Sequence, residues 1–166
     1  MTAAAQPLVE ERVKFGRNVP AEVNALLQQA AANTDNFSAA ERALLAARAL
    51  APAQLEVFIA LYKLYFYRGF TSAAEAVVLE TLQTAADSGG FDSDWRSLSP
   101  ASADWQASEG PARVYLYSLK ALCFIRLRQQ NRDGAAGLLA ALLCLDPDDQ
   151  VGASVLRELA EALEDV

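Results

Sequence analysis

Apolar side chains recur every three or four positions along most of the chain, and this period predicts α-helices. Alanine and leucine fill most of these positions and β-branched residues are sparse, which favours helix over strand. Glycine and proline fall between the periodic stretches, so they mark where helices end. The pattern predicts seven helices, over residues 20–32, 38–50, 53–68, 71–86, 111–130, 133–145 and 149–164.

Residues with known capping preferences stand at several of the expected helix starts. Pro20 suits the beginning of a helix, because the N–H that proline lacks would be unbonded there in any case. Ser38 is expected to cap the second helix, with Glu41 three residues later as its reciprocal partner. Thr71 or Ser72 is expected to cap the fourth helix.

Two segments depart from the helical period. Residues 87–110 are rich in glycine and serine and also contain Pro100, which predicts a long inserted loop with one helical turn. Residues 1–19 are predicted to be an N-terminal arm, either extended or with a short helix over 8–15. The remainder, residues 20–166, is predicted to fold as one helical domain, since a chain of this length buries enough surface without disulfides or metals.

A spacing of small and large apolar residues repeats along the helices. The interval from Ala40 to Ala74 is 34 residues, and the interval from Ala74 to Ala135 is 61 residues. The excess of 27 residues coincides with the loop predicted over residues 87–110, so a single insertion explains it. Gaps of four and three residues follow each alanine, and two of the three sets continue over five residues to a proline: Ala40, Leu44, Ala47 and Pro52; Ala74, Val78 and Thr81; Ala135, Leu139, Leu142 and Pro147.

This register resembles the tetratricopeptide repeat, in which each unit is a pair of antiparallel helices. The resemblance covers about residues 20–147 and implies an all-α, TPR-like stack of about three antiparallel helix pairs. It also implies a loop insertion before the third pair and a capping helix over residues 149–164. The chain departs from the repeat at Tyr62, where the family prefers a small residue, and at Asn24, where it prefers a large apolar one.

A candidate binding surface lies on the first helix of the second pair. In a TPR-like stack this helix lines a concave face, and aromatic anchors beside a charge are typical of protein binding sites. The alternative is that the aromatic residues only pack in the core. The residues expected in the groove are Ile59, Lys63, Phe66 and Tyr67.

Basic residues concentrate on the fifth predicted helix, although the chain as a whole is acidic. They are expected either to receive an acidic partner surface or to pair with the acidic residues near the C-terminus. The set consists of Arg113, Lys120, Arg126 and Arg128. The inserted loop adds Trp95, Arg96 and Trp105, and the two tryptophans are expected either to fold back over the helices or to contact a partner, because exposed indoles are costly in water.

The amino-acid composition excludes several classes of function and site. The chain has no histidine, which removes the commonest general base and the commonest metal ligand, so we expect no catalysis and no cofactor. A net charge of −7 argues against nucleic-acid binding. No apolar run is long enough for a membrane span and no secretory signal is evident, so we expect a cytoplasmic protein. Cys123 and Cys144 are expected to be reduced core residues, with a disulfide or redox pair as the alternative.

Three stretches are similar to small repeat proteins encoded among the nitrogen-fixation genes of diazotrophic bacteria: residues 110–122, residues 149–156, and Asp94-Trp95-Arg96. That resemblance implies a nitrogenase accessory factor that binds the enzyme or an immature form of it. The function expected from the whole sequence is therefore a non-catalytic, chaperone-like interaction module for one protein partner. The alternatives are a structural subunit or homo-oligomeric scaffold, and a TPR chaperone of another system.

Overall fold

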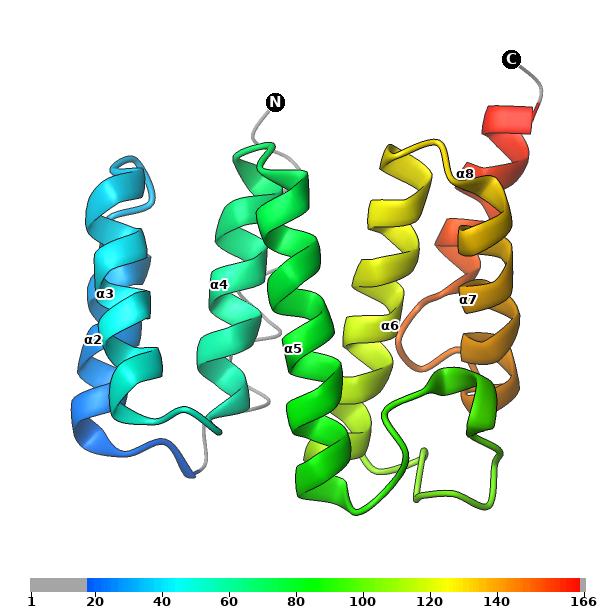
Figure 1. The fold of residues 1–166 in the computed structure, drawn as a ribbon, viewed down its shortest axis with the longest axis horizontal. Helices are drawn as coiled ribbons and strands as arrows, with labels where there is room; N and C mark the ends of the chain where they lie inside the picture. Colours follow the sequence, from blue (N-terminus) through cyan, green and yellow to red (C-terminus); the bar gives the residue numbers. More distant parts are fainter. Residues whose placement is uncertain (1–17, 165–166) are drawn as a thin grey trace. The chain divides into compact units, whose positions relative to one another are not determined.

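The computed structural model of the chain describes residues 18–164. Seven α-helices and one turn of 3-10 helix lie in this range, and no β-strand is present among the described residues (Figure 1). The all-α prediction is therefore confirmed. The predicted N-terminal arm lies almost wholly outside the described residues. The assignment of the helices to a TPR-like stack stays a prediction.

The helices agree with the predicted ranges to within about one turn at most of their ends. The last helix is the main exception, because it begins five residues later than expected. The elements are α2 (Ala21–Ala32), α3 (Phe37–Leu50), α4 (Leu55–Tyr67), α5 (Thr71–Gly89), η3 (Trp95–Ser97), α6 (Pro111–Arg128), α7 (Arg132–Leu145) and α8 (Ser154–Glu164).

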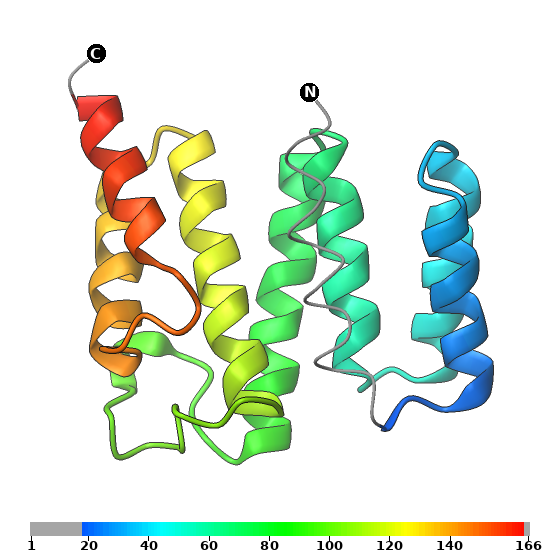
Figure 2. The ribbon, with the colours of Figure 1, turned by 180° about the vertical axis from the view of Figure 1, so that it is seen from behind.

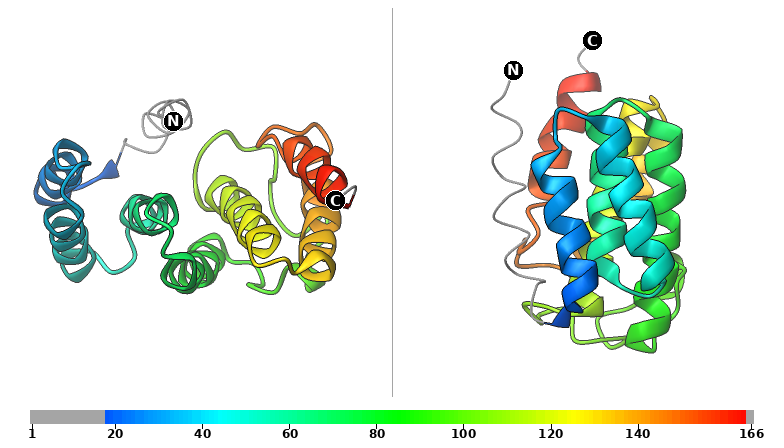
Figure 3. Two further views of the ribbon diagram at one scale, coloured as in Figure 1. Left: turned by 90° about the horizontal axis from the view of Figure 1, so that it is seen from above. Right: turned by 90° about the vertical axis from the view of Figure 1, so that its left-hand side faces the viewer.

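The chain divides into two compact units, and the division falls within α5 after Ala74. In the first unit, α3 packs between α2 and α4, so consecutive helices lie side by side (Figures 1 and 3). Small side chains on α3 permit this packing, because Ala40, Ala43 and Ala47 are all buried. Val23 of α2 and Val57 of α4 form a core cluster with Ala47.

The second unit, which starts at Glu75, has its core along α6. This helix carries the largest fully buried side chains of the unit, among them Leu116, Leu119 and Leu122. It packs against α7, and α8 packs against both of these helices (Figure 2). Within α6 the Ser118 hydroxyl is buried and has no hydrogen-bond partner.

Helix capping differs from the prediction at α3. Asn36 is the N-cap and its side chain accepts a hydrogen bond from the Ala39 N–H at 3.1 Å, whereas Ser38 already lies inside the helix. Glu41 makes no reciprocal cap, because its carboxylate binds the hydroxyl of Tyr65 on α4. The helix therefore begins at the cap residue two positions upstream of the predicted one.

The start of α8 is a second correction. Asp149 has a left-handed φ of 55° and Gly152 a φ of 77°, so the chain turns where a helix was predicted. The Asp149 carboxylate accepts bonds from the Ser154 N–H at 3.1 Å and the Ser154 hydroxyl at 2.6 Å. The helix consequently begins at Ser154, and Val155 in its first turn is 59% exposed.

Both thiols are free. Cys123 is buried as predicted, and burial raises its pKa to about 11. Cys144 is exposed, which corrects the expectation of a core residue, because α7 turns Leu138, Leu142 and Leu145 inward and Cys144 lies on another side of the helix. Among the described residues, no helix is both long and apolar enough to cross a membrane.

Candidate functional site

A tight turn between α4 and α5 exposes aromatic side chains in the described part of the first unit. Gly69 has a left-handed φ of 81°, which glycine adopts without strain, and this ends α4. The Phe70 N–H then donates a 2.9 Å hydrogen bond to the Tyr65 carbonyl, closing the turn. Phe70 is thereby held beside the last turn of α4 with half of its surface exposed.

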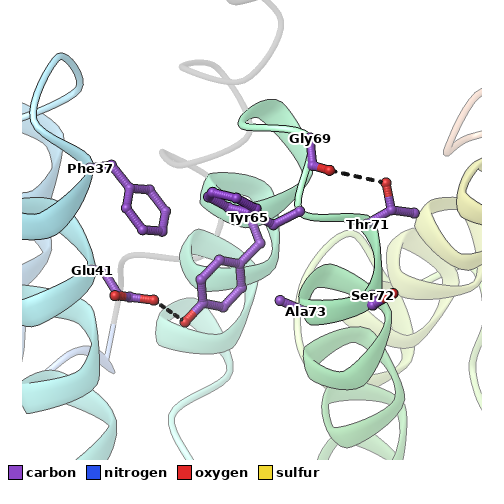
Figure 4. A pocket seen from close by; sticks show the side chains of 8 residues that line it. Phe37, Glu41, Tyr65, Gly69, Thr71, Ser72 and Ala73 are labelled. Carbon is purple, nitrogen blue, oxygen red and sulfur yellow. Dashed lines mark hydrogen bonds between the residues drawn. The ribbon is translucent and has the colours of Figure 1, made fainter.

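An open hollow lies beside this turn, between the first turn of α3, the last turn of α4 and the start of α5 (Figure 4). We call it the aromatic hollow, because three rings contribute to its lining. The centroid of the Phe37 ring is 6.1 Å from that of Tyr65 and 5.1 Å from that of Phe70. The lining residues are Phe37, Glu41, Tyr65, Gly69, Phe70, Thr71, Ser72 and Ala73.

Glu41 supplies the charge of the aromatic hollow. Its Oε2 accepts a 2.6 Å hydrogen bond from the Tyr65 hydroxyl. Burial, followed by this bond and the charge of Glu41, raises the pKa of Tyr65 to about 12, while the charge of Arg48 opposes the shift as the smallest influence. Tyr65 is therefore protonated at neutral pH and acts as a fixed donor that orients the carboxylate.

Arg68 contacts the loop before α3 and the Phe37 ring at one side of the hollow. Its Nη2 donates a 2.5 Å hydrogen bond to the Thr34 carbonyl in the loop between α2 and α3. Its guanidinium carbon also lies 5.9 Å from the centroid of the Phe37 ring, within the range of a cation–π contact. None of Phe37, Glu41, Tyr65 and Phe70 was predicted from the sequence as a site residue. The available signal was that Phe37 and Phe70 each precede a repeated alanine by three or four positions.

The four residues predicted to line a groove all lie on α4, but they differ in exposure. Ile59 is buried, Lys63 and Phe66 are half-buried, and Tyr67 is 50% exposed. The Phe66 and Tyr67 rings pack edge to face, with centroids 5.5 Å apart. Tyr67 is therefore the predicted residue that joins Phe70 at the surface of the first unit, and Ile59 belongs to the core.

In the second unit, Trp105 packs inside the fold. It is 3% exposed, its Nε1 donates a 3.0 Å hydrogen bond to the Ser99 carbonyl, and its ring lies 5.1 Å from that of Phe91. Tyr115 of α6 contacts both rings and donates a 2.7 Å hydrogen bond to the Ser93 carbonyl. The inserted segment is thus folded against α6, the first of the two placements expected for its tryptophans.

Trp95 and Arg96 lie on the 3-10 turn of the insertion. Asp94 caps this turn by accepting from the Arg96 N–H at 3.0 Å. The Arg96 side chain is 73% exposed, pairs with Asp94 at 3.3 Å and places its guanidinium 4.8 Å from the Trp95 ring centroid. These contacts form a small, ordered surface feature of the second unit.

The basic residues of α6 mostly serve the fold. Arg113 is buried and donates to the Ala107 carbonyl at 3.0 Å and to the side chain of Gln150. Lys120 donates to the Val151 carbonyl at 2.7 Å, which holds the turn before α8 against α6. Both side chains donate to neutral groups, and the charge of Lys120 also helps to lower the pKa of Asp149, one of the acidic residues near the C-terminus.

Arg126 and Arg128 complete the basic set. Arg126 forms an ion pair with Glu75 of α5 and a 3.1 Å hydrogen bond with Gln129. The exposed Arg128 lies over the Phe124 ring, 5.7 Å from its centroid. In the described part of the chain, no three histidine, cysteine, aspartate or glutamate side chains are grouped so that they could hold a metal ion.

The chain is similar to a protein of Azotobacter chroococcum mcd 1 that is described as an uncharacterized 19.8 kDa protein in the nifW 5′ region. The two are 28% identical over 122 residues, which cover 72% of this chain and 68% of the relative. No family model matches the chain. No solved structure matches it either.

Proposed function

We propose that this chain is a non-catalytic protein-interaction module that serves nitrogen fixation as an accessory factor, binding and stabilising one protein partner. The partner we propose is a nitrogenase component or an immature form of it. The link to nitrogen fixation is supported by the relative in the nifW 5′ region and by the three sequence stretches similar to small repeat proteins of nitrogen-fixation genes.

The observation that carries a binding role is the pair of exposed aromatic residues at the end of α4. Tyr67 and Phe70 each leave half of their surface in solvent, and Phe70 borders the aromatic hollow. Aromatic side chains provide much of the energy of protein interfaces, and exposing their surface to water costs free energy. Their position on a tight turn also limits the entropy lost on binding.

The proposal includes a TPR-like arrangement of the helix pairs. It is supported by the burial of the three repeated alanines, since Ala40 is 2%, Ala74 is 0% and Ala135 is 3% exposed. In the repeat, a small residue at this position lets neighbouring helices approach closely. These burials agree with the register read from the sequence.

The test is capture of partners from nitrogen-fixing cells under anaerobic conditions, with the tagged chain as bait and a purified nitrogenase component for direct titration. We expect direct, saturable binding that the double substitution Tyr67→Ala and Phe70→Ala weakens at least about tenfold, as for two interface aromatics. Val155→Ala, at an exposed apolar residue of the second unit, is the matched control and should bind normally. Absence of binding to every nitrogenase component would refute the choice of partner.

The competing function is a homo-oligomeric scaffold, because the same exposed aromatics could meet in a second copy of the chain. Measuring the mass in solution separates the two. A monomer at low micromolar concentration supports the accessory role. A stable oligomer that the double substitution dissociates would instead assign Tyr67 and Phe70 to self-association.

A further inference from the structure

The chemistry of the aromatic hollow is specific in one respect: it combines ring faces with a single carboxylate. Phe37 comes from α3, Tyr65 from α4 and Phe70 from the turn before α5, and Glu41 is the one charged residue among the eight that line the hollow. Aromatic faces carry negative electrostatic potential, so rings and a carboxylate attract the same class of group, a cation. From this combination we infer that the aromatic hollow binds a lysine or arginine side chain of a partner protein. The inference rests on the proposed function and states what that partner must present.

The structure already places one basic side chain, that of Arg68, over one of these rings, that of Phe37. The guanidinium of Arg68 lies 5.9 Å from the Phe37 centroid, while its Nη2 is held by the Thr34 carbonyl. Arg68 is not among the residues that line the hollow. A second cation can approach the hollow from solvent, where Phe70 is half exposed.

The carboxylate is held in position to receive such a group. Tyr65 donates to Oε2 of Glu41, which fixes the rotamer of the acid, and a carboxylate has a second oxygen that can accept from a ligand. Charge-assisted hydrogen bonds to an ammonium or guanidinium are stronger than neutral ones. Thr71 and Ser72 add hydroxyl groups at the edge contributed by α5, which can accept further N–H bonds (Figure 4).

Charge complementarity selects this occupant over an acidic or purely apolar one. The Glu41 carboxylate is the charge that lines the hollow, so a basic group is attracted there and an acidic one is repelled. An apolar side chain would bury the Glu41 carboxylate without a partner, which carries a desolvation cost. The aliphatic stem of lysine or arginine can pack on the rings while its charged end reaches Glu41.

The test is a titration of the whole chain, followed by NMR, with N-acetyl-lysine amide and N-acetyl-arginine amide as probes. The neutral N-acetyl-norleucine amide, which has the stem of lysine without its charge, is the control ligand. We expect saturable shifts at Phe37, Tyr65, Phe70 and Ala73 with the basic probes only. Glu41→Gln should weaken this binding by about fivefold, the effect of one partly screened charge pair. Glu22→Gln, the same substitution at an exposed position of α2, should leave it unchanged.

Three results would overturn the inference: no saturable shift at these residues, equal shifts with the norleucine probe, or undiminished binding by Glu41→Gln. The control for folding is the dispersion of the remaining resonances, and Phe70→Ala, at a half-exposed side chain, is a second variant that should weaken the probes. The outcome is separable from that for the proposed function. A captured nitrogenase partner that binds Glu41→Gln at full strength would refute the cation site alone, whereas saturable lysine binding without any nitrogenase partner would refute the accessory role alone.

Discussion

The Tyr65 hydroxyl donates a 2.6 Å hydrogen bond to Oε2 of Glu41, joining α4 to α3 across 24 residues of sequence. Burial of Tyr65, followed by this bond, which a tyrosinate could not donate, raises the pKa of Tyr65 from its usual 10.0 to about 12. A group whose pKa is raised by folding stabilises the protein fully below its unfolded pKa, and this contribution is lost as the pH rises through the folded value.

Tyr65→Phe should therefore lower the free energy of unfolding at pH 7, by about 1 kcal/mol for one partly buried hydrogen bond. The difference from the wild type should shrink as the pH rises from 10 to 12, because Tyr65 ionises more readily in the unfolded chain than in the folded one. Urea unfolding followed by circular dichroism at a series of alkaline pH values measures it. A difference that stays constant across the window would show that Tyr65 titrates as it does in the unfolded chain.

Removing either of two buried hydroxyl groups should change the free energy of unfolding, but in opposite directions. Ser118 on α6 has no hydrogen-bond partner, whereas Thr81 on α5 donates a 2.7 Å bond to the Val77 carbonyl. Ser118→Ala should raise the free energy of unfolding by about 1 kcal/mol, because an unsatisfied buried polar group is removed and alanine favours the helix. Thr81→Val should lower it by about 1 kcal/mol, because a satisfied bond is lost. Urea unfolding of both variants decides the matter, and a loss of stability in Ser118→Ala would mean that its hydroxyl is bonded.

The two tryptophans of the insertion should differ in their effect on stability. Trp105 is buried between Phe91 and Tyr115, so Trp105→Ala should cost about 3–5 kcal/mol of unfolding free energy. Trp95 is half-buried and stacks with Arg96, so Trp95→Ala should cost about 1 kcal/mol or less. Denaturation of the two variants, followed by far-ultraviolet circular dichroism, gives the comparison. Equal losses would mean that the insertion does not pack on α6 as described.

The turn before α8 should be sensitive to acid. Hydrogen bonds from Ser154, its hydroxyl first, lower the pKa of Asp149, so its charge stabilises the fold above the usual pKa of an aspartate. Asp149→Asn should reduce stability at neutral pH, and the difference should disappear as the pH falls through the folded pKa. Asparagine also tolerates the left-handed backbone at this position. Asp148→Asn, at the exposed neighbouring residue, controls for the loss of one negative charge. If the stability difference between Asp149→Asn and the wild type did not change with pH, the capping role of Asp149 would be contradicted.

Local patterns predicted most of the helices, because the period of apolar residues and the punctuation by glycine and proline are properties of short segments. The insertion was also predictable, since the interval between the repeated alanines exposed it. Errors occurred where two local solutions compete. Asn36 and Ser38 are both good caps, and sequence alone does not rank them. A left-handed Asp149 is uncommon enough that continuing the helix was the better prediction.

The aromatic hollow was not predictable from the sequence, for a different reason. Phe37, Tyr65 and Phe70 meet only when α3 packs on α4 and the turn at Gly69 places Phe70 beside them. The pairing of Glu41 with Tyr65 likewise depends on the relative rotation of two helices. Such contacts between segments far apart in the sequence carry no local pattern. The predicted groove residues followed from the family resemblance, and α4 exposes only part of them.

The position of the insertion also determines which part of the protein can be followed by tryptophan fluorescence. Both tryptophans of the chain lie in it, so both belong to the unit that starts at Glu75, and the unit before it contains none. Intrinsic tryptophan fluorescence therefore reports on the unfolding of the second unit and not on that of the first unit, which holds the aromatic hollow. Circular dichroism sees the helices of both. If the unfolding curves from the two signals coincide, the two units unfold in one cooperative transition. If the curves differ, each unit unfolds separately, and its stability can be measured without a mutation or a label.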